Sequence, residues 1–317
     1  MSTFLTLTLN PALDMATRTP QVRPTHKLRC TTAEHYPGGG GINVARVLHR
    51  LGSPVQAWYL AGGPTGERLQ TLLQAEGVQT QAQPIAGQTR ENFSVIEDST
   101  GQEFRFVLPG PKVQTAEWQA CLHGLAAVQP RPQWLVASGS LPPGVPDDFY
   151  AQLARQARHQ NQQLVLDTSG PALSSALQAG VGLLKVSLRE LRELTGQALA
   201  QPAQWAIAAH SLVAQGQAQM VALSLGEQGA LLATPAGVWQ AAALTVPTDE
   251  GTTGAGDCFL AALVWALAQD HPPAQALAWG VAGGTAALLS GGTRLAQPHD
   301  IHRLQPQVRV HSVAKLC

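Results

Sequence analysis

A chain of 317 residues is long enough for one large α/β domain, or for such a domain with a small appendage. Twenty basic and twenty acidic residues give a formal net charge of zero, only 13% of residues are charged, and no basic cluster occurs, so a nucleic-acid-binding surface is not expected. No signal peptide or bilayer-length apolar run is evident, and the dipeptide Gly-Lys of a standard P-loop is absent, so we expect a cytoplasmic protein without that loop.

The first predicted strand covers residues 3–9, where apolar side chains alternate with Thr. Asn10-Pro11-Ala12-Leu13-Asp14 follows as a predicted loop at the carboxyl end of that strand. Ligands of open α/β sheets bind at this edge, which makes Asp14 a candidate substrate contact. On position alone, a turn-forming Asp is the simpler interpretation. Residues 15–36 lack a helical period and are predicted to form small exposed strands.

Four consecutive glycines open the next predicted helix, in the sequence Pro37-Gly38-Gly39-Gly40-Gly41-Ile42-Asn43-Val44. Such a run costs conformational entropy in a structured region, so it needs a reason. A flexible hinge is one explanation. Because the run leads directly into a helix, we favour a ligand that lies against bare backbone, with Asn43 on the first turn directed at it.

A second strand-rich insertion interrupts the βα pattern that residues 55–83 begin. Apolar residues around 93–96 and 104–107 flank Asp98-Ser99-Thr100-Gly101, which predicts a β-hairpin with its turn at the glycine. We therefore predict a small β-sheet lid from residues 13–36 and 89–107. Residues 1–12, 37–88 and 108–317 are predicted to form the nucleotide- and substrate-binding α/β domain. Arg90 and Arg105 flank the hairpin and are either phosphate contacts or solvated charges.

From residue 116 onward, predicted helices and strands alternate regularly, which indicates a mostly parallel sheet with right-handed crossovers. The predicted helices cover residues 116–127, 147–159, 188–195, 202–215 and 274–289. The predicted strands cover residues 134–138, 164–167, 182–186 and 220–225.

Three glycines lie within six residues in Gly251-Thr252-Thr253-Gly254-Ala255-Gly256-Asp257, and an apolar helix follows. A helix N-terminus offers unpaired backbone N–H groups and a partial positive charge, and glycines let an anion approach them. Asp257 beside such a site suits a base that takes a proton during phosphoryl transfer. Taken alone, this stretch supports an ordinary glycine turn with Asp257 at the start of a helix equally well.

Several motifs together resemble one family. Gly39-Gly40-Gly41-Ile42-Asn43 and Gly254-Ala255-Gly256-Asp257 are similar to the two motifs of the ribokinase-like (PfkB) carbohydrate kinases. Thr89-Arg90-Glu91-Asn92, Ser138-Gly139-Ser140-Leu141-Pro142-Pro143-Gly144 and Phe104-Arg105-Phe106-Val107-Leu108-Pro109-Gly110 resemble its phosphofructokinase branch. The resemblance implies a ribokinase-like fold and ATP-dependent phosphorylation of a sugar phosphate, closest to conversion of fructose 6-phosphate into fructose 1,6-bisphosphate.

The resemblance also implies roles for individual residues. Asp257 would be the general base, and the backbone of Gly254, Ala255 and Gly256 the anion hole. The sugar-phosphate side would be formed by Asp14, Lys27, Gly39, Gly40, Asn43, Arg90, Arg105, Ser138 and Ser140. The nucleotide side would be formed by Lys185, Ser187, Ser224, Gly226, Gly229, Thr252, Gly254, Gly256, Gly284 and Ala287. Mg²⁺ is expected at Glu190 through a bound water, and K⁺ is a further candidate ligand near Thr253, Ala287, Ser290 and Gly292.

Two departures from the family pattern bear on the cations. The family commonly carries Asn-x-x-Glu where this chain has Ser187-Leu188-Arg189-Glu190, so we expect Glu190 to matter more for Mg²⁺ than Ser187. Gly251 stands where relatives often have Asp or Ser, which leaves the dependence on K⁺ open.

Three functions stay open at this point. A kinase for fructose 6-phosphate is favoured over a kinase for tagatose 6-phosphate or fructose 1-phosphate. A sugar-phosphate binder without turnover is motivated by Ser187 and opposed by Asp257 with its glycines. Beyond ATP and a phosphorylated hexose, the expected partner is a second copy of the chain, because a small sheet with an apolar face needs cover. No nucleic acid or membrane partner is expected.

Overall fold

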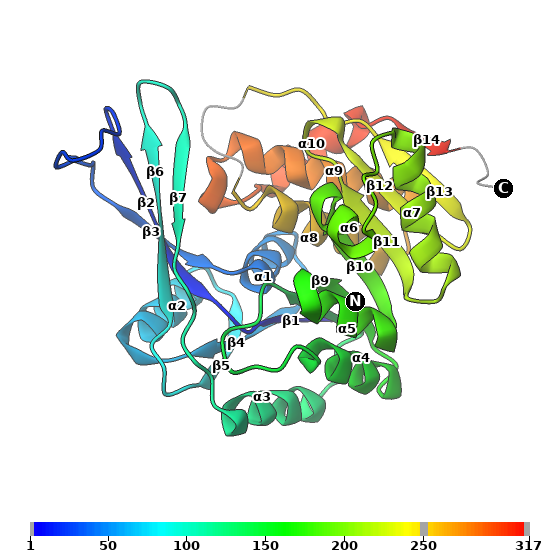
Figure 1. Cartoon of the computed structure of the whole chain (residues 1–317), viewed down its shortest axis with the longest axis horizontal. Coiled ribbons are helices and arrows are strands. Elements are labelled where there is room, and N and C mark those ends of the chain that lie inside the picture. Colours follow the sequence, from blue (N-terminus) through cyan, green and yellow to red (C-terminus); the bar gives the residue numbers. More distant parts are fainter. Residues whose placement is uncertain (1–2, 248–252, 314–317) are drawn as a thin grey trace.

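The computed structural model describes residues 3–247 and 253–313, which form two β-sheets with helices packed around the larger one (Figure 1). The larger sheet has the strand order β14-β13-β12-β11-β10-β9-β8-β1-β4-β5. Its strands are β1 (Phe4–Thr8), β4 (Val55–Ala61), β5 (Gln79–Pro84), β8 (Trp134–Ser138), β9 (Gln163–Asp167), β10 (Val181–Ser187), β11 (Ala218–Ser224), β12 (Ala230–Thr234), β13 (Gly237–Ala241) and β14 (Val310–Val313).

The strands from β5 to β11 in this order are parallel, and β12, β13 and β14 continue the sheet as antiparallel strands. Parallel strands need crossover connections, which the helices supply. The carboxyl ends of β1, β8, β9 and β10 therefore meet at one edge of the sheet. This edge is where an open α/β sheet binds its ligands.

Helices cover both faces of the large sheet (Figure 1). One face packs against α1 (Gly40–Arg50), α2 (Gly63–Ala75), α8 (Ala255–Ala268), α9 (Pro273–Leu289) and α10 (Pro298–Leu304). The other packs against α3 (Thr115–Ala127), α4 (Phe149–His159), α5 (Gly170–Ala179), α6 (Leu188–Thr195) and α7 (Pro202–Ala214). Short 3₁₀ helices are η1 (Gly226–Gln228), η2 (Gly292–Arg294) and η3 (Gln305–Gln307).

Side-chain alternation along the strands explains the two cores. In β1, Phe4 packs into the α1–α8–α9 core, whereas Leu5 and Leu7 pack into the core on the opposite face. Central strands covered on both faces are apolar almost throughout, as parallel strands are expected to be. Within the described residues, no helix is long and apolar enough to cross a membrane.

The smaller sheet has the order β3-β2-β6-β7 and stands beside the helical body in Figure 1. Its strands are β2 (Ala12–Thr19), β3 (Glu34–Gly38), β6 (Arg90–Glu97) and β7 (Glu103–Val107). They come from the two stretches for which the sequence predicts a lid. Phe93 and Phe106 stack on it with ring centroids 4.6 Å apart, and 39% and 46% of their surfaces stay exposed. The bounds of the lid as a separate domain stay a prediction.

Polar contacts tie this lid sheet to segments near the ends of α8 and α9. The Thr253 hydroxyl donates to Glu103 at 3.1 Å, and Arg294 donates to Glu34 at 3.3 Å and to the Tyr36 hydroxyl at 3.2 Å. The lid sheet therefore contacts the segments that precede α8 and follow α9.

The sequence-based assignment was wrong or incomplete at several places. Asp14 does not lie in a loop: β2 begins at Ala12 because residues 12–16 pair with β3, and residues 12–19 pair with β6. Helix α5 was not predicted, since its ten residues include Gly, Pro and two Ser. Strands β12, β13 and β14 were also missed.

Candidate active site

The start of helix α8 places an acid among exposed backbone donors. Gly254 is the N-cap and has a φ of 80°, a left-handed conformation that side chains disfavour. Ala255, Gly256 and Asp257 form the first turn, whose N–H groups have no partner within the helix. A Cβ at position 256 would lie 3.3 Å from Lys185 Nζ, so this turn approaches a cationic side chain closely.

Asp257 is held by a neighbouring amide. Asn43, from the first turn of α1, donates a hydrogen bond from Nδ2 to Asp257 Oδ2 at 2.8 Å. Burial, followed by repulsion from Asp167, raises the pKa of Asp257 to about 6; the Asn43 hydrogen bond and the charge of Lys185 oppose this rise, and Asp14 adds to it. A carboxyl with this pKa is ionised at neutral pH yet more basic than an ordinary Asp, which suits a general base.

Asp167, at the end of β9, connects two predicted site residues to each other. Lys185 Nζ lies 3.1 Å from Asp167 Oδ1, and the Ser138 hydroxyl donates to Asp167 Oδ2 at 3.2 Å. Burial alone would lower the pKa of Lys185, but the charges of Asp167 and Asp257 outweigh it and raise that pKa. Asp167 was missed as a site residue. Its place as the last residue of a buried parallel strand was the available signal.

Asp14 lies between the lid sheet and the glycine run. Asn92, its partner on β6, donates to Asp14 Oδ1 at 2.9 Å. Gly38 packs so closely against this carboxylate that any Cβ there would clash with it. Burial raises the pKa of Asp14, while the Asn92 hydrogen bond and the charges of Arg105, Arg90 and Arg46 act in the opposite direction.

The two lid arginines have different surroundings. Arg105 is exposed and lines a small pocket together with Asp14, Asn92 and Thr253. Arg90 is partly buried, and its guanidinium donates to the backbone carbonyls of Asn10 and Leu108, each at 2.9 Å. Arg105 is thus presented to the pocket, whereas Arg90 also holds the chain around it.

Ser187 and Glu190 form a capping box at the start of α6. Ser187 is the N-cap, and its backbone N–H and hydroxyl each donate to Glu190 Oε2 at 2.7 Å. The serine in place of the family asparagine thus has a structural use, since Ser caps helices well. Nearby, the Ser224 hydroxyl donates to the carbonyl of Val186 at 3.4 Å, which brings the ends of β10 and β11 together.

The other predicted residues fall into three groups. Gly40 packs against Ser138, Asn10 donates to the Ser140 hydroxyl at 3.0 Å, and Gly284 packs against α8 near Ala255. The second group is defined by its place in the fold: Gly39 precedes α1, Gly226 and Gly229 begin and follow η1, Ala287 and Ser290 lie at the end of α9, and Gly292 begins η2. Lys27 lies on the exposed β2–β3 connection, and Thr252 lies outside the described residues.

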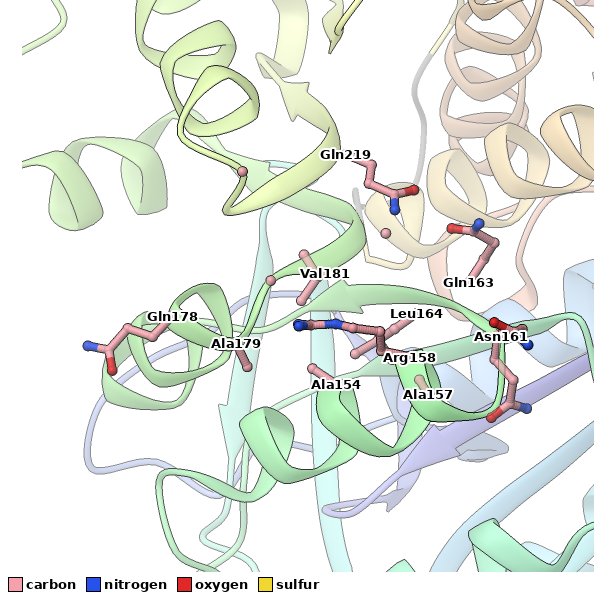
Figure 2. Close-up of a pocket in the computed structure, with 14 residues that line it drawn as sticks. Ala154, Ala157, Arg158, Asn161, Gln163, Leu164, Gln178, Ala179, Val181 and Gln219 are labelled. Atoms are coloured by element: carbon pink, nitrogen blue, oxygen red, sulfur yellow. The ribbon is translucent and has the colours of Figure 1, made fainter.

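A cavity of about 520 Å³ opens elsewhere, where β9, β10 and β11 begin (Figure 2). Arg158 lies near the middle of the residues that line it, among which are Asn161, Gln163, Gln178 and Gln219. None of the predicted site residues lines this cavity. It lies at the amino ends of these strands, whereas Asp167 and Ser187 lie at the carboxyl ends of β9 and β10.

Together, the described residues provide the parts of a phosphoryl-transfer site. An ionisable base stands at a helix N-terminus, a lysine lies next to the same turn, and an arginine lines the lid side of a pocket that contains Asp14. Phosphoryl transfer depends mainly on positioning and on stabilising negative charge, which backbone N–H groups and cations supply.

Comparison with known proteins also indicates phosphoryl-transfer chemistry. The model of the pfkB family of carbohydrate kinases matches residues 8–300. ATP-dependent 6-phosphofructokinase isozyme 2 of Mycobacterium tuberculosis is 44% identical over 300 residues, which are 95% of this chain and 88% of that protein. The 1-phosphofructokinase of Bacillus subtilis is 32% identical over 307 residues, covering 96% of this chain and 98% of that one.

Solved structures of phosphofructokinase-2 from Escherichia coli share the fold. The potassium complex superimposes with a TM-score of 0.92 at 39% identity, and the fructose-6-phosphate complex with 0.91 at 38%. A tetrameric inhibited form superimposes with a TM-score of 0.90 at 38% identity. Each of the three alignments covers 97% of this chain and 99% of the other.

Proposed function

The chain belongs to the pfkB family of carbohydrate kinases and is an ATP-dependent sugar-phosphate kinase; on this premise we propose that it converts fructose 6-phosphate into fructose 1,6-bisphosphate. The observation that carries the proposed chemistry is Asp257, with a pKa of about 6, at the N-terminus of α8 and held there by Asn43. The choice of acceptor is supported by the 44% identical 6-phosphofructokinase and by the fructose-6-phosphate complex of a similar structure.

In the proposed reaction, Asp257 accepts the proton of the sugar hydroxyl on carbon 1. That oxygen forms its bond to the γ-phosphorus of ATP while the bond between the γ-phosphorus and the bridging oxygen breaks, and ADP leaves with the electron pair. The backbone N–H groups of Gly254, Ala255 and Gly256 stabilise the negative charge of the group in transfer. Lys185, held by Asp167, adds a fixed positive charge beside the same turn.

The sugar phosphate is proposed to lie between α1 and the lid. Asp14 and Asn43 are proposed to accept and donate hydrogen bonds to the sugar hydroxyl groups, with the backbone of Gly39 and Gly40 alongside; the support is that both side chains are held in fixed positions, by Asn92 and by Asp257. Arg105 is proposed to bind the phosphate on carbon 6, supported by its exposure in the pocket that Asp14 and Asn92 also line. Arg90 is proposed to hold the backbone around this phosphate site through the carbonyls of Asn10 and Leu108. Ser138, Ser140 and Lys27 complete the predicted set of sugar-phosphate contacts.

The nucleotide is proposed to lie on the β10–β11 side, along Lys185, Ser187, Ser224, Gly226, Gly229, Gly284 and Ala287. Mg²⁺, which typically keeps several waters and takes one or two carboxylates beside phosphate oxygens, would neutralise the phosphates there. Glu190 is proposed as the carboxylate for Mg²⁺. Its Oε2 is used by the capping box of α6, whereas its Oε1 makes a longer contact, 3.9 Å from the exposed Arg189. Carbonyls at the end of α9, near Ala287 and Ser290, suit a monovalent cation such as K⁺, with Gly292 just beyond that end and Thr253 just before α8.

We further propose that two copies of the chain pair through their lid sheets. Support comes from the stacked rings of Phe93 and Phe106, which stay partly exposed on one face of the lid sheet. Lone apolar residues on a surface are common, but a contiguous patch on a small sheet is a sign of an interface. The tetrameric form of a similar phosphofructokinase-2 leaves a larger assembly as the alternative.

The test of the proposed acceptor is ADP release with matched substrates. Purified protein is given ATP and Mg²⁺ with fructose 6-phosphate, tagatose 6-phosphate, fructose 1-phosphate or unphosphorylated fructose. We expect the highest kcat/KM with fructose 6-phosphate. A higher value with tagatose 6-phosphate would change the acceptor but keep the chemistry, and no turnover with any of the four would contradict the proposed function.

One alternative acceptor has its own support. The 32% identical relative from Bacillus subtilis is a 1-phosphofructokinase, and a pocket with Arg105 on the lid side does not by itself say which carbon carries the phosphate. A clear preference for fructose 1-phosphate in the same assay would favour this second function.

A further inference from the structure

The buried side chain of Arg46 is a part of this site that the proposed mechanism does not use. Arg46 lies on α1, one turn beyond Asn43, and only 1% of its surface is exposed. A buried guanidinium needs a carboxylate and a full set of acceptors, because an unpaired buried charge is costly. Glu76, the C-cap of α2, provides the carboxylate: Arg46 Nη2 lies 2.7 Å from Glu76 Oε1, and Arg46 Nε donates to both oxygens at 3.0 Å.

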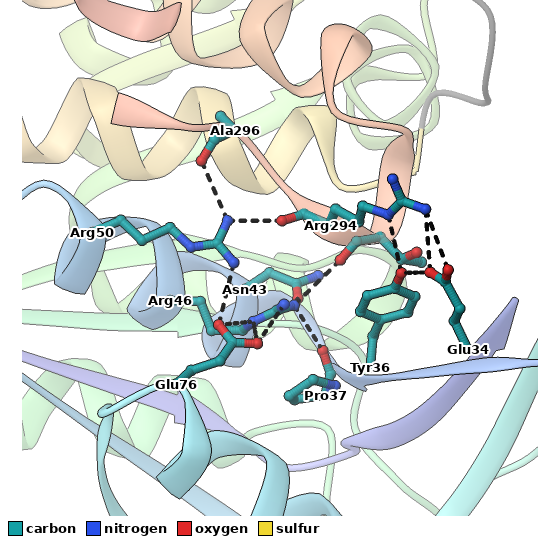
Figure 3. Close-up of polar contacts among 10 residues, drawn as sticks. Glu34, Tyr36, Pro37, Asn43, Arg46, Arg50, Glu76, Arg294 and Ala296 are labelled. Atoms are coloured by element: carbon teal, nitrogen blue, oxygen red, sulfur yellow. Dashed lines mark hydrogen bonds and ion pairs between the residues drawn. The ribbon is translucent and has the colours of Figure 1, made fainter. Parts of the chain in front are cut away.

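The remaining donors of the Arg46 guanidinium lie beside Pro37 and Asn43 (Figure 3). Its Nη1 donates to the carbonyl of Pro37 at 3.1 Å and, over a longer 3.4 Å, to Asn43 Oδ1 and to the carbonyl of Thr293. One planar group therefore joins the end of β3, the first turn of α1 and the segment that follows α9. Its contact with Asn43 continues directly to the catalytic carboxylate, because Asn43 Nδ2 donates to Asp257 Oδ2.

The carboxamide of Asn43 can adopt two orientations that differ by a flip of its oxygen and nitrogen. In the observed orientation, the oxygen faces the donors of Arg46 and the NH₂ group faces the carboxylate of Asp257. The flipped orientation would place NH₂ against a guanidinium and an oxygen against a carboxylate. Both contacts would then be repulsive, so the cation at Arg46 selects the orientation in which Asn43 can donate to Asp257.

We propose that Arg46 is a positioning residue of the kinase reaction, which, anchored by Glu76, fixes the carboxamide of Asn43 so that it donates to the catalytic base Asp257. This inference rests on the proposed function only for the role of Asp257 as the base. The hydrogen-bonded connection Glu76–Arg46–Asn43–Asp257 itself is part of the structure.

Arg50 offers a matched control within the same network (Figure 3). Its guanidinium donates to Glu76 at 3.2 Å and to the carbonyls of Arg294 and Ala296 at 2.7 Å and 3.3 Å. It thus binds the same carboxylate and the same segment after α9 as Arg46 does. Among the described residues, it makes no hydrogen bond to Asn43, so its replacement perturbs the packing without reaching Asp257.

The test compares Arg46→Lys with Arg50→Lys. A lysine keeps the charge but cannot bind Glu76 with a fork and contact Asn43 at once. We expect Arg46→Lys to lower kcat by about tenfold, the order expected for loss of a hydrogen bond to a charged group. The KM for ATP should change little. Arg50→Lys should retain the wild-type kcat.

A change in the titration of Asp257 distinguishes positioning from a merely structural role. Asn43 lowers the pKa of Asp257, whose other charged neighbours are Asp167 on β9, Lys185 on β10 and Asp14 on β2. These neighbours stay in place in both variants. The acid limb of the kcat/KM–pH profile should therefore move to higher pH in Arg46→Lys and stay at the wild-type pH in Arg50→Lys.

Carbon-13 NMR of the aspartate carboxyls follows the same group without turnover, with the Asp257 signal assigned from its loss in Asp257→Asn. A wild-type protein inactive on all sugars would contradict the proposed function, while the NMR titration would still test Arg46. An unmoved Asp257 titration in Arg46→Lys would overturn the Arg46 inference alone.

A double-mutant cycle adds a second criterion. If Arg46 acts through Asn43, Arg46→Lys should lower kcat little further in an Asn43→Ala background. If the double variant instead lost kcat by the product of the two single fold-changes, the two residues would act independently and the proposal would be overturned. Should Arg46→Lys not fold, Glu76→Gln removes only the charge of the partly buried anchor, and we expect a smaller shift of the Asp257 titration in the same direction. A titration that stays in place in this variant would also overturn it.

Discussion

Asp257 combines two properties that a single residue rarely has. It stands at a helix N-terminus, where an ionised carboxylate is normally stabilised, and yet burial and Asp167 raise its pKa to about 6. The balance leaves it ionised at neutral pH with more basicity than an exposed Asp, whose ordinary value is 3.8. The Asn43 hydrogen bond keeps this carboxylate in one place while its basicity is raised.

The raised pKa predicts how the rate depends on pH. Below a pH of about 6, Asp257 takes up a proton and can no longer accept one from the sugar, so kcat/KM should fall about tenfold per pH unit. An ordinary Asp would lose activity only near pH 4.

A pH–rate profile between pH 4.5 and 9, recorded with saturating Mg²⁺, measures this fall in kcat/KM, the acid limb of the profile. The second ionisation of a phosphate lies near pH 6 as well, so binding of the sugar phosphate must be titrated in parallel. A limb that disappears once binding is corrected for would contradict the assignment of Asp257.

Replacement of the two lid arginines should have different effects on substrate affinity and on thermal stability. Arg105→Ala removes a charge from the pocket, and we expect the KM for the sugar phosphate to rise at least about tenfold, with the Tm close to wild type. Arg90→Ala should raise the same KM and also lower the Tm, because the carbonyls of Asn10 and Leu108 lose their donor. Steady-state kinetics and thermal unfolding test both. An equal rise in the KM for ATP would argue against phosphosugar binding by either residue.

At the scale of elements, α6 shows what a departure from the family pattern does. Ser187 caps α6, and Glu190 returns the contact in a capping box. Ser187→Ala should therefore reduce stability by about 1 kcal/mol, seen as a Tm lower by a few degrees, with kcat retained at saturating Mg²⁺.

Glu190→Gln is the matched variant. It should raise the Mg²⁺ concentration for half-maximal activity by about tenfold, because it removes the proposed carboxylate of the metal site. Mg²⁺ titrations of both variants test whether the two residues have these different roles, a helix cap for Ser187 and a metal contact for Glu190. If Ser187→Ala shifted the Mg²⁺ requirement as strongly as Glu190→Gln, the serine would have to act at the metal and not only as a cap.

Elements with a clear period were predictable, and those defined by tertiary pairing were not. The strand predicted at residues 134–138 and the helix predicted at 188–195 agree with β8 and α6, since their apolar patterns and flanking turns are local signals. Helix α5 has weak propensity and owes its stability to packing against α4. Strand β14 lies far along the chain from its partner β13, and the residues near either strand do not predict that they pair.

The same distinction applies to the site. The two glycine-opened helices indicated Asn43 and Asp257 separately, but their hydrogen bond joins residues 214 positions apart. Asp167 appeared only as the end of a strand, and its contacts with Ser138 and Lys185 depend on β8, β9 and β10 lying side by side. Asp14 was picked as a site residue from its place after β1, although the loop predicted there is part of β2.

At the scale of the whole molecule, the lid sheet links the active site to assembly. Its inner strands carry Asp14 and Asn92, and the same sheet exposes Phe93 and Phe106. Pairing of two lids would remove these aromatic faces from water and hold the sheet that carries the sugar contacts. We therefore expect assembly and affinity for the sugar phosphate to change together.

This expectation is tested by Phe106→Asp, which places a charge on the exposed lid face. Sedimentation at micromolar concentration should show a monomer, with a raised KM for the sugar phosphate. Ile207→Asp on α7, an equally exposed apolar position, is the control and should keep the wild-type assembly. An unchanged sedimentation coefficient in Phe106→Asp would place the interface elsewhere.

The most direct test of the central claim is the kcat of Asp257→Asn with ATP and fructose 6-phosphate. The asparagine keeps the shape of the side chain, and because the fold disfavours the ionised carboxyl, the Tm at pH 8 should not fall below wild type. We predict a kcat lower by about 10²–10⁴-fold with the KM for ATP nearly unchanged, as for loss of a general base. A kcat within about tenfold of wild type would show that Asp257 is not the base.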